Sequence, residues 1–176
     1  MDIELLLKDS SRATIDKATE QVLKNRKLFD EIIELSLYNY TKYSLRATRV
    51  LHFCAVHNPD LVKPYLPEIL QGLKTKENDS IRGNLLSVFY EIELPNDEDF
   101  LGELTQVCFE LLNGKSERES LAVYSIDILY KICKFYPELK NELIQNIQSL
   151  LPHKNAAFQC RGKNILTKLK KRDTSY

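Results

Sequence analysis

The sequence predicts an all-α protein made of about four helical hairpins that follow one another along the chain, with capping segments at its ends. Two observations predict this fold. The first helices share a small residue that recurs at intervals of 36, 40 and 39 residues, at Ala47, Gly83, Val123 and Gly162. The second helices align independently at intervals of 36, 39 and 39 residues, on Ile33, Ile69, Cys108 and Ile147. Sustained period-2 alternation, which would indicate strands, is almost absent.

Each repeat is predicted to be two helices joined by a short turn. Apolar side chains follow the small residue at offsets of three and seven, which place them on one helix face. Pro59, Pro95 and Pro137 lie in the turns within units, each followed closely by an acid, as is typical where a new helix begins. The predicted units of a single domain over residues 1–176 are 13–38, 41–75, 79–113 and 117–152, with a capping helix at 156–172.

This pattern resembles the HEAT repeat family, within the broad armadillo-type class. The resemblance covers about residues 13–172, and it is carried by Leu45-Arg46 with Val50-Leu51, by Ile81-Arg82-Gly83 with Leu86, by the prolines and by the Leu-rich second helices. It implies a right-handed α-α superhelix, a solenoid whose second helices line a concave side where partners are commonly held. The first helix of the first unit aligns poorly, as is typical of a repeat that caps a stack.

An arginine precedes the small residue in three units, at Arg46, Arg82 and Arg161, whereas Ala122 takes this place in the fourth. A row of guanidinium groups aimed at phosphates is one interpretation. We favour the alternative in which each arginine bonds to carbonyls or acids of a neighbouring unit and holds the stack together. Gly83 and Gly162 indicate close helix packing, since glycine costs about 1 kcal/mol inside a helix.

Composition narrows the classes of function. Lys and Arg together number 25, as do Asp and Glu, so no overall charge attracts the chain to nucleic acid or to an acidic membrane surface. No apolar run approaches the roughly 20 residues that span a bilayer. The first residues have the features of neither a signal peptide nor a transit peptide. We therefore expect a soluble, cytoplasmic protein without a membrane segment.

Signals for chemistry are missing from the sequence. The cysteines form no CxxC pair, and each lies among apolar residues of a helical pattern, so buried free thiols are expected at Cys54, Cys108, Cys133 and Cys160. The three histidines form no HExxH motif or i, i+4 pair. No phosphate-binding glycine loop or nucleophile elbow occurs. We expect no metal, no cofactor and no enzymatic activity.

The exposed face of the second helices is the expected contact surface for another protein. The residues predicted to bind this partner are Gln71, Lys74, Glu103, Gln106, Glu110, Glu142 and Gln145. Residues 97–110 hold five acids and no base, so this surface would repel a phosphate backbone. The function predicted is that of a non-enzymatic scaffold that binds another protein.

Two surfaces have alternative interpretations. In the first unit, Leu28 and Leu35 occupy the positions that face the groove elsewhere; residues 3–7 cap this apolar strip, which we favour, or it is an exposed docking patch. Residues 153–172 hold seven Lys or Arg and no acid. This basic end keeps open an alternative function, nucleic-acid binding, as in the similar HEAT-like DNA glycosylases. We favour a helix cap, because cations stabilise the C-terminal end of a helix.

Overall fold

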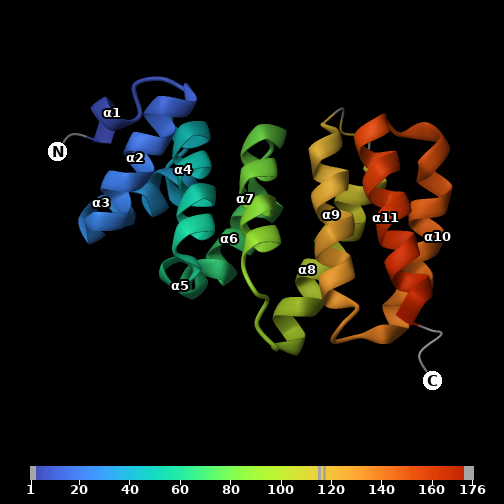
Figure 1. Ribbon diagram of the computed structural model, residues 1–176. Coiled ribbons are helices and arrows are strands. Elements are labelled where there is room, and N and C mark those ends of the chain that lie inside the picture. The colour runs from blue at the N-terminus through green and yellow to red at the C-terminus, as the bar shows by residue number, and fades with distance from the viewer. Residues whose placement is uncertain (1–2, 115, 117, 173–176) are drawn as a thin grey trace. The chain divides into compact units, whose positions relative to one another are not determined.

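The computed structural model describes residues 3–114, 116 and 118–172, and within this part of the chain every regular element is helical (Figure 1). The all-α prediction is confirmed. Contacts within the chain divide it into two compact units, Met1–Glu93 and Leu94–Tyr176.

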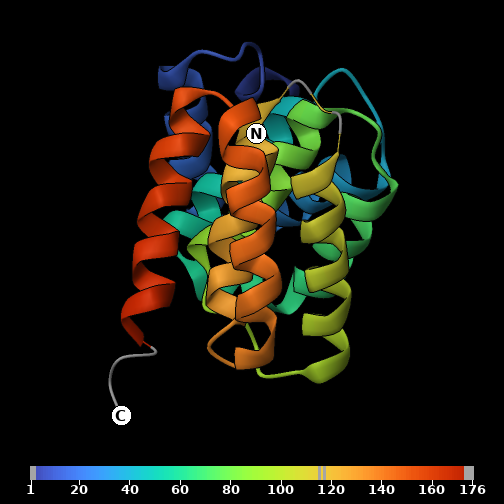
Figure 2. The same ribbon diagram turned by 90° about the vertical axis from the view of Figure 1, so that its right-hand side faces the viewer.

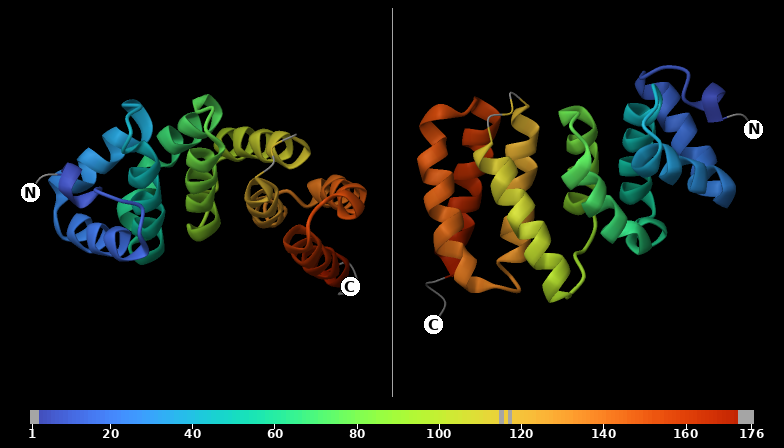
Figure 3. Two further views of the ribbon diagram at one scale, coloured as in Figure 1. Left: turned by 90° about the horizontal axis from the view of Figure 1, so that it is seen from above. Right: turned by 180° about the vertical axis from the view of Figure 1, so that it is seen from behind.

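The first unit contains two rows of helices. In one row α4 packs against both α2 and α7; in the other, α3 continues into a π-helical turn, η1, which contacts α6 (Figure 3). The elements are α1 (Ile3–Leu6), α2 (Arg12–Lys24), α3 (Arg26–Ile33), η1 (Glu34–Tyr38), α4 (Ser44–His57), α5 (Pro59–Val62), the 3-10 turn η2 (Lys63–Tyr65), α6 (Leu66–Thr75) and α7 (Asp79–Glu91).

Asparagine side chains begin several of these helices. Asn25 ends α2 and caps α3, where its side-chain oxygen accepts from the backbone N–H of Lys27 at 3.0 Å. Asn58 caps α5, with Pro59 in the first position, and Asn78 caps α7. Such caps satisfy backbone N–H groups that have no partner within the helix. These caps explain why α3, α5 and α7 start where they do.

The aligned positions form the core of the first unit. Ala47, Val50 and Cys54 of α4 are fully buried, as are Leu86 of α7 and Ile69 of α6. The periodicity of the sequence therefore identified the inward faces correctly. Burial of such apolar surface is the main force that holds adjacent helices together.

In the second unit, α9 contacts α8, α10 and α11 (Figure 2). Its elements are α8 (Glu98–Asn113), α9 (Glu119–Ile132), the 3-10 turn η3 (Pro137–Leu139), α10 (Lys140–Leu150), the 3-10 turn η4 (Leu151–His153) and α11 (Ala156–Arg172). A Cβ added at Gly162 of α11 would lie 3.0 Å from Ile147 Cγ2 of α10. This confirms the close helix packing that Gly162 indicated.

One expectation from the sequence is wrong, and one alternative is excluded. Cys160 is exposed, because the buried face of α11 is made by Phe158, Gly162, Ile165 and Leu169, and a residue two positions from this stripe points away from it. Leu28 is 3 % exposed and belongs to the core of α3, which excludes the alternative of an exposed docking patch at this residue. In residues 3–7, α1 packs against α2 and Leu7 is completely buried.

Candidate protein-binding surface

One face of α8 presents an acidic and polar surface. Glu103, Gln106 and Glu110 are all exposed, and their spacing of three and four residues places them on the same face. Gln106 Nε2 donates to Glu110 Oε1 at 2.9 Å. The opposite face holds α8 in the core through Leu101, Leu104, Cys108 and Leu111, all buried. The exposed surface is thus presented by a helix that is firmly packed on its other side.

The other predicted contact residues lie on α10 and α6. Glu142 and Gln145 are exposed on α10, whose buried face includes Leu143 and Ile147. Gln71 and Lys74 are exposed on α6, which belongs to the first unit. The structure therefore brings Glu103, Gln106 and Glu110 together on one helix, and it distributes the remaining four residues over two further helices.

The acids at the start of α8 have a local structural role. The side chain of Asp97 accepts from the backbone N–H of Phe100 at 2.9 Å, and Glu98 and Asp99 lie in the first turn. Negative charge at this end stabilises a helix through its dipole. Glu103 and Glu110 lie further along the helix, outside the first turn. Their charges therefore lie beyond the turn in which the helix dipole acts most strongly.

The arginines of the repeat bind within the protein. Arg46 donates from one terminal nitrogen to the carbonyl oxygens of Leu7 at 2.7 Å and Lys8 at 3.1 Å. Arg161 Nε of α11 donates to both carboxylate oxygens of Asp127 of α9, at 2.7 and 2.8 Å. The expectation that the arginines bond to carbonyls or acids of a neighbouring unit is confirmed for these two. Arg82 differs, because its ion pair of 3.2 Å is with Asp79 of its own helix.

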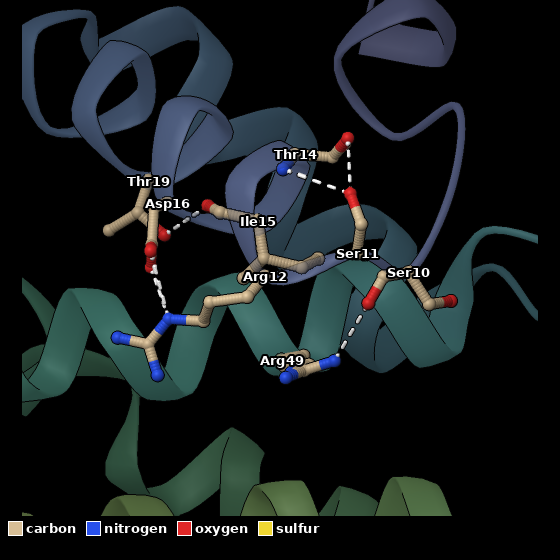
Figure 4. A network of polar contacts seen from close by, with 8 residues as sticks. All are labelled: Ser10, Ser11, Arg12, Thr14, Ile15, Asp16, Thr19 and Arg49. Carbon is tan, nitrogen blue, oxygen red and sulfur yellow. Dashed lines mark hydrogen bonds and ion pairs between the residues drawn. The ribbon is translucent and has the colours of Figure 1, made fainter.

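A polar network joins the start of α2 to α4 (Figure 4). Arg49 donates to the carbonyl oxygen of Ser10 at 2.9 Å, Ser11 caps α2, and Arg12 pairs with Asp16 at 2.7 Å. The Arg12 guanidinium also lies 4.4 Å from the ring centroid of Phe53. The sequence analysis missed this network. Its local signals are the Ser11 cap and the i, i+4 spacing of Arg12 and Asp16, whereas the contacts of Arg49 with Ser10 and of Arg12 with Phe53 join residues far apart in the sequence.

Several bases of the C-terminal segment already have partners. Lys154 lies 3.9 Å from Glu119, and Arg161 pairs with Asp127. Lys168 Nζ lies 5.8 Å from the ring centroid of Tyr130. Lys163 and Lys170 are exposed on α11, whereas the side chains of Lys171 and Arg172 lie outside the described residues. This distribution favours the interpretation that the basic helix closes the unit.

The thiols of the core are unsuited to nucleophilic chemistry. Burial raises the pKa of Cys54 to about 12 and that of Cys133 to about 11, and it also raises the pKa of Cys108. A thiol with a raised pKa forms little of the reactive thiolate at neutral pH. Among the described residues, no group of three or more His, Cys, Asp or Glu could hold a metal ion. A search of the same residues finds no helix with the length and apolar character to cross a membrane.

Comparison with known families identifies the repeat. The profile of the HEAT repeat domain matches residues 3–169, which includes all eleven α-helices of the described chain in whole or in part. No curated protein matches the sequence. The family match agrees with the all-α fold and with the paired helices of the repeat.

Proposed function

Because the chain belongs to the HEAT repeat family, whose members are commonly helical-repeat scaffolds, we propose that it is a non-enzymatic protein-binding scaffold. Its partner is another protein, which contacts the exposed face of α8 with support from Glu142 and Gln145 of α10. The observation that carries this proposal is the set of Glu103, Gln106 and Glu110 on one exposed helix face, in a segment without a base.

The charge of this face defines the chemistry of the partner. Two carboxylates flank the amide of Gln106, so a partner surface with Lys, Arg or neutral donors complements it. A phosphate backbone would meet charge of the same sign. Gln71 and Lys74 of α6, in the first unit, complete the proposed set of contact residues.

Charge reversal on α8 tests the proposal. Glu103→Lys with Glu110→Lys should leave the fold intact, since exposed substitutions change stability by less than about 0.5 kcal/mol. The variant should slow association with the partner and alter its salt dependence, because exposed charges act mainly on the association rate. The partner is first recovered by affinity purification from source cells, and association is then measured on a biosensor at several salt concentrations.

A matched control reverses two exposed acids of the other unit, Glu77→Lys with Glu93→Lys, and should leave association nearly unchanged. Replacing Lys163, Lys168 and Lys170 by Gln tests the alternative function. If this variant loses nucleic-acid binding that falls steeply with salt, while the α8 variant binds every partner normally, the scaffold proposal is wrong and the basic helix is the binding site.

A further inference from the structure

Two hollows flank the exposed side chain of Leu5 in the first unit. One, of about 510 Å³, lies against α2 and is lined by Leu5, Leu6, Lys8, Ala13 and Lys17, among others. The other, of about 500 Å³, lies towards the start of α4 and is lined by Glu4, Leu5, Lys8, Lys42, Tyr43 and Arg46. Leu5 is 67 % exposed although its neighbours Leu6 and Leu7 are buried. It is therefore an apolar side chain presented to solvent between two concave surfaces.

The charges around Leu5 are predominantly positive. The lining of the two hollows includes four bases, Lys8, Lys17, Lys42 and Arg46, and one acid, Glu4. The Glu4 carboxylate accepts a hydrogen bond from the Tyr43 hydroxyl at 2.9 Å. Among the described residues, no ion pair joins Lys8 or Lys17 to a carboxylate, and Arg46 bonds to neutral oxygens. The lining of the two hollows therefore carries an excess of positive charge, which Asp9 beside Lys8 offsets in part.

The segment that carries Leu5 is held in place mainly through its backbone carbonyl groups and its buried leucines. Arg46 binds the carbonyl oxygens of Leu7 and Lys8, and Arg49 binds the carbonyl oxygen of Ser10. Leu6 and Leu7 anchor the segment in the core. Leu5 and Lys8 are thereby presented on a fixed backbone, which reduces the entropy that a ligand must overcome on binding.

We propose that this surface binds an acidic peptide segment of a partner protein, with an apolar side chain placed beside Leu5. Carboxylates of the peptide lie against Lys8, Lys17 and Lys42, and its apolar side chain removes Leu5 from water. This site is of opposite charge to the face of α8, so it takes a different class of ligand. It does not depend on the function proposed for α8.

The experiment is a titration of the full-length, ¹⁵N-labelled chain with the synthetic peptide Ac-EDELFEDE-NH2, followed by NMR. Saturable shifts are expected in residues 4–17 and 42–46. The charge-reversed peptide Ac-KRKLFKRK-NH2 should not bind, and Ac-EDESSEDE-NH2, which lacks the apolar pair, should bind more weakly. Raising the salt concentration should weaken binding, because the charges on this surface are exposed.

Variants locate the site. Lys8→Glu with Lys17→Glu should weaken binding by about tenfold or more, since it converts attraction to repulsion. Leu5→Ser tests the apolar contact without changing charge and should also weaken binding. Lys27→Glu, at an exposed position of α3 that lines neither hollow, is the matched control and should have no effect. Hydrogen exchange of α2 and α4 in each variant verifies that the unit remains folded.

Three results would overturn the proposal: no saturable shifts, equal binding of the charge-reversed peptide, or unchanged affinity in both the lysine and the Leu5 variants. Sedimentation with anionic vesicles of phosphatidylcholine and phosphatidylglycerol provides a further arm. If the chain sediments with these vesicles through Lys8 and Lys17 but does not bind the peptide, the surface binds lipid headgroups and the peptide assignment is wrong.

Discussion

Replacement of Arg161 by Met isolates the ion pair that joins α11 to α9. The side chain of Asp127 is 7 % exposed and that of Arg161 is 32 % exposed. Both carboxylate oxygens accept from Arg161 Nε within 2.8 Å. Methionine keeps an aliphatic stem of similar reach but donates no hydrogen bond, so the Asp127 carboxylate stays buried without its cationic partner.

Breaking a buried ion pair in this way costs about 3–5 kcal/mol. Because a third of Arg161 is in contact with water, solvent can hydrate part of the space that the guanidinium leaves. We therefore expect a loss of about 2–4 kcal/mol in the free energy of unfolding. The double variant Arg161→Met, Asp127→Leu should recover much of this loss, since it removes the unpaired charge as well.

Urea unfolding followed by circular dichroism gives the free energy, and hydrogen exchange of α9 and α11 shows where the loss occurs. Lys24→Met is the control, because its pair with Glu20 is exposed at 67 % and 62 %, so solvent screens it and its loss should have little effect on stability. The reasoning fails if Arg161→Met costs as little as this control, or if the double variant loses the full sum of the two single variants.

Three further predictions follow from packing and burial. Cys160 should react with a thiol reagent in the native chain, whereas the three buried thiols should react only on unfolding; mass spectrometry of each labelled cysteine checks this. Gly162→Ala should cost about 1–3 kcal/mol, because its Cβ would lie 3.0 Å from Ile147, whereas Gly102→Ala, with no atom within 4 Å, should stabilise α8 by about 0.5–1 kcal/mol; thermal unfolding compares them. Burial lowers the pKa of His52 from 6.5, so the folded chain binds fewer protons there than the unfolded chain. The contribution of neutral His52 to the free energy of unfolding is complete above pH 6.5 and is lost as the pH falls through the lowered pKa. His52→Gln should therefore make the free energy of unfolding less dependent on pH in this range.

The repeat and its inward faces could be predicted because each core position recurs with the period of the unit. Val50, Leu86, Ile69 and Ile147 all follow this rule, and all are buried. Cys160 lies outside the aligned positions, and its apolar neighbours concealed that it points away from the buried stripe of α11. Alignment with α8 places Leu28 at a groove-facing position, but in α3 it lies on the buried face together with Phe29, Ile32 and Ile33.

The candidate surfaces were predictable to different degrees. The exposure of Glu103 and Glu110 follows from the helical period of α8 alone. The hollows beside Leu5 had no comparable signal, because they depend on how α1 packs against α2 and on the bonds from Arg46 to two backbone carbonyls. A carbonyl oxygen is present in every residue, so the sequence does not mark which one an arginine will bind.

Because of these bonds, the sequence of residues 3–10 can vary at its exposed positions without loss of its attachment to α4. Arg46 and Arg49 bind main-chain oxygens of Leu7, Lys8 and Ser10, so the identity of Lys8 contributes little to attachment, whereas the Ser10 hydroxyl adds one side-chain bond by accepting from Arg46 Nε at 3.3 Å. A designer can therefore diversify the outward side chains of this segment and keep its mode of attachment. The residues that must be kept are Arg46 and Arg49 of α4, because lysine would not reproduce the forked geometry of the guanidinium. Variation of this kind would change what the first unit displays to its surroundings while its core stays the same.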